Sequence, residues 1–159
     1  MSVRSVLISW DFFFAMVFSI AVAVLLPGRM DLTVAQALYE VGISVLAIVF
    51  SVYFAALAIV ISSGDDKFVL FLEEDGTFGK ILQMFQFTII VLFIALIVSL
   101  ALYGLCSVWL KAGCASRGTA VRWMTVVFVF TFSYGLFAAL CSALDSIKYA
   151  RYRLSLIHI

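Results

Sequence analysis

Uncharged apolar stretches alternate with short charged segments along this chain of 159 residues. The stretches 41–61, 81–110 and 123–144 contain no charged residue, and 5–26 contains only Asp11. About 18 or more such residues are typical of a membrane-spanning helix, because only a helix satisfies its own backbone hydrogen bonds inside hydrocarbon. The pattern therefore predicts an all-α, polytopic membrane protein built as a four-transmembrane-helix bundle.

Helix boundaries follow from the same pattern. Pro27 and Gly28 stop the first helix, because proline lacks an N–H and clashes with the preceding turn. The third run has 30 uncharged residues, which would measure ~45 Å as a helix against ~30 Å of hydrocarbon. Gln83 and Gln86 lie in its first turns, so we expect those turns outside the hydrocarbon. The expected helices cover about 6–26, 38–61, 81–110 and 121–144 of a single transmembrane domain, 1–153.

Small residues recur at every fourth position within these stretches. Such spacing places small side chains on one helix face, where backbones can approach closely inside a membrane. We expect a packed bundle rather than loosely associated helices, although alanine and serine are common enough for the spacing to arise by chance. The expected packing residues are Ala47, Ser51, Ala55, Gly135 and Ala139.

The segment between the second and third stretches is acidic. Asp65, Asp66, Glu73, Glu74 and Asp75 are five of the nine acidic residues, in two clusters on either side of an apolar run. A capping signature at its start and a glycine at its end predict a short interfacial helix, with a solvated linker as the alternative. The acidic charge makes this loop a candidate docking surface for a basic protein partner or for the basic tail of a neighbouring copy.

Composition supports a membrane location and weakly orients the chain. The chain is 66% hydrophobic and 12% charged, whereas soluble domains carry about 25% charged residues. Four crossings place both termini and the acidic loop on one side, with six Lys and Arg residues there against four on the other. This distribution favours cytoplasmic termini. A net charge of +1 gives no reason to expect a nucleic-acid partner.

Separate predictions apply to the first apolar run and to the last six residues of the chain. The first apolar run continues beyond any cleavage point after Ala23, so we expect a retained helix rather than a signal peptide. Residues 154–159 resemble the translated transposase-recognition end used in preparing sequencing libraries. The natural sequence is then expected to run to about Arg153, and His158, the single histidine, to have no role. An ordinary apolar tail is the alternative.

Three polar residues are candidates for an intramembrane role: Asp11, Gln83 and Gln86. Asp11 lies 16 positions before Pro27, or ~24 Å of helix, which predicts a place near the inner membrane boundary. There we favour an anchoring role over ion or proton handling. Gln83 and Gln86 share a helix face, where they would bond to a neighbouring helix or line a polar vestibule. Glu40 is expected at a helix end.

The sequence carries no recognisable catalytic constellation. No serine has a base at a suggestive spacing, the three cysteines form no paired motif, and the glycines form no phosphate-binding loop. We therefore expect no enzyme activity, no cofactor and no metal site. The leading hypothesis is a non-catalytic, self-associating membrane subunit or scaffold with the acidic loop as its cytosolic contact. The alternatives are an oligomeric channel or pore and, third, a small secondary transporter using Asp11 or Gln86.

Overall fold

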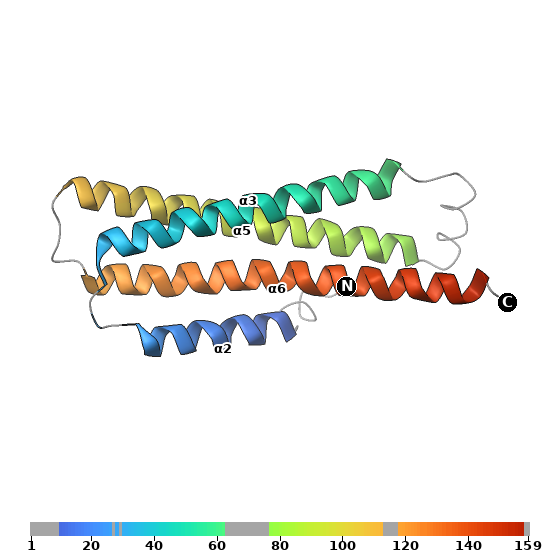
Figure 1. The fold of residues 1–159 in the computed structure, drawn as a ribbon, viewed down its shortest axis with the longest axis horizontal. Coiled ribbons are helices and arrows are strands. Elements are labelled where there is room, and N and C mark those ends of the chain that lie inside the picture. The colour runs from blue at the N-terminus through green and yellow to red at the C-terminus, as the bar shows by residue number, and fades with distance from the viewer. Residues whose placement is uncertain (1–9, 27, 29, 63–76, 113–117, 158–159) are drawn as a thin grey trace.

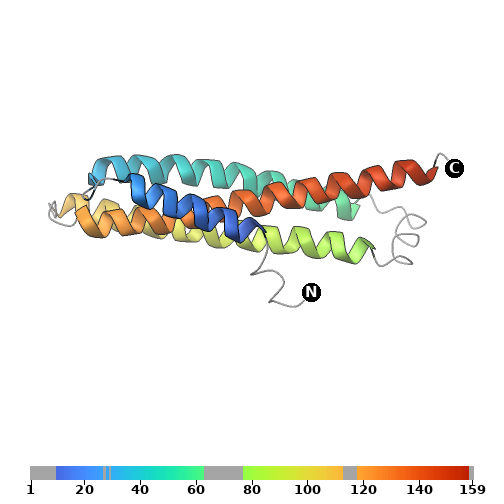
Figure 2. The same cartoon turned by 90° about the horizontal axis from the view of Figure 1, so that it is seen from below.

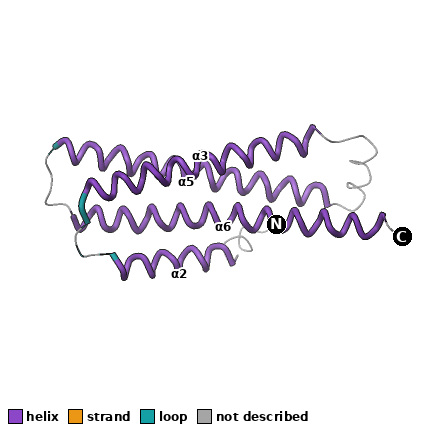
Figure 3. Tube along the Cα trace, in the orientation of Figure 1, coloured by secondary structure: helices purple, strands orange, loops and turns teal. Residues whose placement is uncertain are grey.

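The described part of the chain forms four long helices. The computed structural model describes residues 10–26, 28, 30–62, 77–112 and 118–157, and no strand is found within them. Successive helices run in opposite directions along one common axis (Figures 1 and 3). The helices are α2 (Trp10–Leu25), α3 (Leu32–Ser62), α5 (Thr77–Lys111) and α6 (Gly118–Ile157).

Three of these helices contain stretches long and apolar enough to cross a membrane: Leu32–Ile59, Leu82–Lys111 and Gly118–Ile147. The all-helical prediction is confirmed, and the three spans fit a membrane protein. The apolar part of α2, Asp11–Leu25, is shorter than these spans. The expected start of the first helix lies in 1–9, and the expected interfacial helix lies in 63–76. Both segments are outside the described residues, so the count of four spans stays a prediction.

Helix α6 is the centre of the arrangement. It packs against α2 on one side and against α3 and α5 on the other, while α3 and α5 also pack against each other. Figure 1 shows α2 across α6 from α3, and Figures 1 and 2 both show α2 running along only one half of the longer helices. Among the described helices, α2 is therefore held chiefly by its contact with α6.

Two helix boundaries differ from those expected. Helix α3 begins at Leu32 rather than near 38, because Asp31 caps it: the Thr33 N–H donates to Asp31 Oδ1 at 3.2 Å. Helix α6 continues past 144 to Ile157. Charged residues after 144 do not break a helix, and no glycine or proline follows Gly135. The expected boundary at 144 is the end of the apolar run, whereas the helix itself continues to Ile157.

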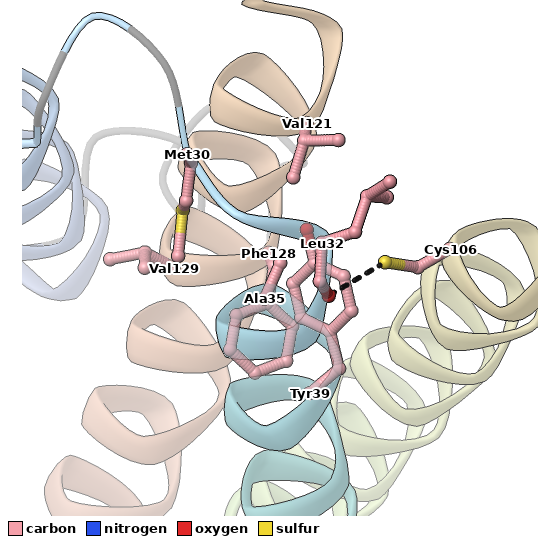
Figure 4. Close-up of a cluster of buried hydrophobic side chains, with 8 residues drawn as sticks. All are labelled: Met30, Leu32, Ala35, Tyr39, Cys106, Val121, Phe128 and Val129. Atoms are coloured by element: carbon pink, nitrogen blue, oxygen red, sulfur yellow. Dashed lines mark hydrogen bonds between the residues drawn. The ribbon is translucent and has the colours of Figure 1, made fainter. Parts of the chain in front are cut away.

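Two clusters of buried hydrophobic side chains lie in the interior. The first lies where α3 and α6 begin and α5 ends, with the partly buried Val22 of α2 against it; Figure 4 shows its members. They are Met30, Leu32, Ala35, Tyr39, Cys106, Val121, Phe128 and Val129. The second, Leu46, Leu92, Ala95 and Ala139, lies further along the same helices. The spacing of Leu32, Tyr39 and Leu46 shows that α3 turns one seven-residue stripe inward.

Gly42 belongs to this inward side of α3 and is needed for the close approach of α6. A Cβ atom at Gly42 would lie 2.2 Å from Cζ of Phe128. The Phe128 ring is buried, with the Tyr39 ring at 4.8 Å and the Phe132 ring at 5.7 Å, so it has little room to move away. Glycine is therefore the residue that allows the Phe128 ring to pack against the α3 backbone.

We expect Gly42→Ala to destabilise the protein by about 1–3 kcal/mol, the usual cost of overpacking a close-packed core. The matched control is Gly104→Ala in α5, where a Cβ atom would have nothing within 4 Å. That change should be neutral or stabilising by up to ~1 kcal/mol, from helix propensity. Unfolding of both variants in detergent micelles measures the difference. Equal stability of the two would show that Phe128 does not pack against Gly42.

Candidate functional site

A chain of polar contacts joins α3 to α6 inside the first cluster. The hydroxyls of Tyr39 and Thr125 lie 2.9 Å apart, and both residues are fully buried. Thr125 has one proton to donate, either to the Val121 carbonyl at 3.0 Å or to the Met30 sulfur at 3.3 Å. Tyr39 can then donate to Thr125. Every hydroxyl in this group has a partner, as burial requires.

Further polar contacts join other pairs of helices near the same end. The Cys106 thiol donates to the Leu32 carbonyl at 3.4 Å, as Figure 4 shows, and the Gln36 amide donates to the Tyr103 hydroxyl at 3.3 Å. Both contacts connect α3 with α5. Arg122 of α6 donates from Nη2 to the Ala23 carbonyl in the last turn of α2, at 2.7 Å. A cation there satisfies a free carbonyl and the negative end of the helix dipole.

Tyr39 and Arg122 were not predicted to hold helices together. The side chain of Tyr39 is nevertheless fully buried between the helices. The seven-residue spacing with Leu32 and Leu46 was the available signal that Tyr39 faces inward. Nothing in the sequence indicated that Arg122 would reach the end of α2, because that contact depends on how α2 and α6 are paired.

Asp11 lies in the first turn of α2, beside the central part of α6, and its predicted place near the inner membrane boundary stays a prediction. Its neighbour Phe12 packs edge-on against the rings of Phe130 and Tyr134, with centroids 5.6 and 6.1 Å apart. These positions fall in the central part of the apolar span Gly118–Ile147.

Other predicted polar residues lie on the outer surface. Gln83 and Gln86 are exposed on α5 and are not brought together with Asp11 of α2. Glu40 is also exposed, eight residues after Leu32 and therefore ~12 Å along α3. The expectation that Glu40 marks the helix end is wrong, because Asp31 starts the helix earlier.

The five predicted packing residues divide into two groups. Gly135 and Ala139 are buried, and a Cβ atom at Gly135 would lie 3.4 Å from Leu92 and 3.6 Å from Ala95 and Leu46. These distances leave room for alanine but not for leucine. On α3, Ser51 and Ala55 are exposed and Ala47 is half-buried. This second group therefore faces outward from the described helices.

The predicted interaction-loop residues Asp65, Asp66, Glu73, Glu74 and Asp75 lie outside the described residues. Among the described residues, no three His, Cys, Asp or Glu side chains gather in a group that could hold a metal ion. Several hydroxyls donate to a carbonyl of their own helix, as Ser99 does to Ala95 at 2.7 Å. Such hydroxyls serve packing rather than chemistry.

Comparison of the chain with protein-family models, with curated proteins and with solved structures finds no match. Two features remain after the interhelical bonds have been accounted for. One is the outward group of small residues on α3, and the other is Asp11 beside the middle of α6.

We expect the Tyr39–Thr125 contact to contribute about 0.6–1.5 kcal/mol to stability, the range for hydrogen bonds between helices in membranes. A double-mutant cycle with Tyr39→Phe and Thr125→Val tests this, because it separates the pairwise term from the effect of each change. Unfolding of the four proteins is measured in the same detergent. A coupling energy indistinguishable from zero would mean that the two hydroxyls do not bond.

Proposed function

We propose that this protein is a multi-pass membrane protein with four spans whose function is to self-associate as a non-catalytic subunit or scaffold. The first span is proposed to begin before Trp10. Helix α2 has 16 residues, ~24 Å, and nine more precede it, so the chain is long enough to complete a crossing of ~30 Å. The excess of Lys and Arg on one side supports cytoplasmic termini.

The observation that carries this proposal is a second seven-residue stripe on α3. Ala37, Ser44, Ser51 and Ala58 follow each other at intervals of seven and are all exposed. Since successive helix residues are ~100° apart, this stripe lies roughly 130° around α3 from the buried stripe of Leu32, Tyr39 and Leu46. One stripe meets α5 and α6, and the other faces away from them.

Small residues on a lipid-facing helix surface are typical of a site where another helix packs. Helices in hydrocarbon are not driven together by the hydrophobic effect, so association depends on close packing, which small residues permit. Helix α3 is also the least covered of the three spans: 11% of its apolar window is buried, against 28% in α5 and 39% in α6. These features favour a further helix against this face.

A second copy of the chain is the partner that fits the stripe best. Small residues at intervals of seven are self-complementary, because two identical stripes can interlock along their length when the helices cross at a small angle. From Ala37 to Ala58 the stripe is ~32 Å long, about the thickness of the hydrocarbon layer. The acidic loop is then proposed to present its charges in several copies to a basic partner.

Cysteine crosslinking in native membranes tests this proposal. In a background with Cys106, Cys114 and Cys141 replaced by alanine, single cysteines at Ser44 and Ser51 should give disulfide-linked dimers on mild oxidation. The matched controls are Val41 and Val52, which are 64% and 61% exposed but lie roughly 80° around the helix. We expect at least fivefold more dimer from the stripe positions.

Two outcomes would contradict the proposal. Equal dimer yields from the stripe and control positions would indicate random collision in the membrane. No dimer from any position, with each variant shown to be folded, would leave the stripe facing lipid alone.

A further inference from the structure

Helices α2 and α6 lie side by side, run in opposite directions and keep one register. Arg122 donates to the Ala23 carbonyl, and the Ser19 hydroxyl donates to the Val126 carbonyl at 3.3 Å. Four residues back along α2 therefore correspond to four residues forward along α6. Phe12, seven residues before Ser19, packs edge-on against an aromatic ring of α6 further along the same side. Each step towards the N-terminus thus corresponds to one step further along α6.

The side of α6 that faces α2 continues beyond its contacts with that helix. The Phe137 ring still meets the Phe14 ring of α2, with centroids 6.0 Å apart. Leu140, Cys141 and Leu144 follow Phe137 on the same side, because they lie three, four and seven residues after it. Both leucines are exposed, at 54% and 48%, and Cys141 is half-buried. These three residues form the uncovered face of α6, and Figure 1 shows that α2 begins only part-way along α6.

The nine residues that precede Trp10 have the length and the composition to cover this face. As a helix, nine residues measure ~14 Å, whereas the seven steps from Phe137 to Leu144 measure ~10 Å. Residues 5–9 are uncharged, and residues 1–9 contain neither glycine nor proline, the residues that stop a helix. If the register of α2 and α6 continues, Ser5 comes to the level of Leu140.

Ser5 also belongs to the row of residues through which α2 faces α6. It lies seven residues before Phe12 and fourteen before Ser19, and both of these contact α6. Over two heptads a straight helix drifts by only ~40°, so the row keeps its direction. A serine on this row permits close packing, as the buried Ala15 and Ser19 do further along it.

The charges at the ends of the two apolar runs are complementary in the same register. The charge-free part of α6 ends at Asp145, and Arg4 is the first charged residue before 5–9. Arg4 comes to the level of Cys141, four residues or ~6 Å short of Asp145 along the helix. A long arginine side chain extends along a helix surface over such a distance. Opposite charges therefore meet where both runs end.

We propose that residues 1–9 continue α2 along α6 and pack on its uncovered face. The inference rests on the proposal that the first span begins before Trp10, and it names the surface on which that span completes its packing. It does not depend on self-association, because the exposed stripe of small residues belongs to α3, across α6 from α2 (Figure 1). Close packing of these residues against α6 supplies the contacts that hold them there.

Disulfide formation within one chain, in native membranes, tests the proposal. In a protein that keeps Cys141 as its only native cysteine, Ser5→Cys should link to Cys141 on mild oxidation. The matched controls are Ser2→Cys and Ser9→Cys, which lie fourteen and seven residues before Met16 and so share its outward side; Met16 is 46% exposed. We expect at least fivefold more linked peptide from position 5, measured by mass spectrometry of the monomer.

Equal yields from position 5 and the control positions would overturn the proposal, and so would disulfides that form only between two copies. If Ser5→Cys does not fold, Ile8→Cys with Phe137→Cys takes its place in the cysteine-free background. These two positions are at the same level in the register, and Ile8 lies seven residues before the fully buried Ala15. Dimers linked through α3 are scored separately, so the two proposals can fail independently.

Discussion

The close approach of α6 to each of the other described helices is the contact on which the rest of the structure depends. Gly42 lets α3 come close to Phe128, Gly135 lies within contact distance of α3 and α5 side chains, and Arg122 ties the end of α2 to α6. In hydrocarbon such contacts must supply most of the association energy, because lipid and protein surfaces are equally apolar. Small residues and satisfied polar groups on α6 therefore determine where its neighbours lie.

The existence of the helices could be predicted from the sequence, but their pairing could not. An uncharged run reports the solvent around it, so the apolar parts of α3, α5 and α6 were located closely. The same run does not report which neighbour lies beside it or at what height. Arg122 shows the consequence: its position in the sequence does not reveal that it reaches the Ala23 carbonyl, because that contact depends on the register between α2 and α6.

Helix α3 shows a related limit of pattern reading. It carries two stripes with seven-residue spacing, and its small residues predict Ala47, Ser51 and Ala55 as the packing side. The structure turns Tyr39 and Leu46 inward instead. Large side chains can fill the space between α3, α5 and α6, whereas the small side chains on the other face of α3 permit close packing against a further helix. Spacing identifies a contact face, and side-chain volume alone does not say which contact is internal.

The stripe of small residues on α3 requires only a neighbour of matching shape, so the association proposed for it depends on protein concentration in the bilayer. The contacts of α6 do not depend on another copy, because they join helices of one chain: Phe128 packs against Gly42 of α3, and Arg122 binds the end of α2. The same packing that turns Tyr39 and Leu46 of α3 inward leaves the small residues on its other side exposed.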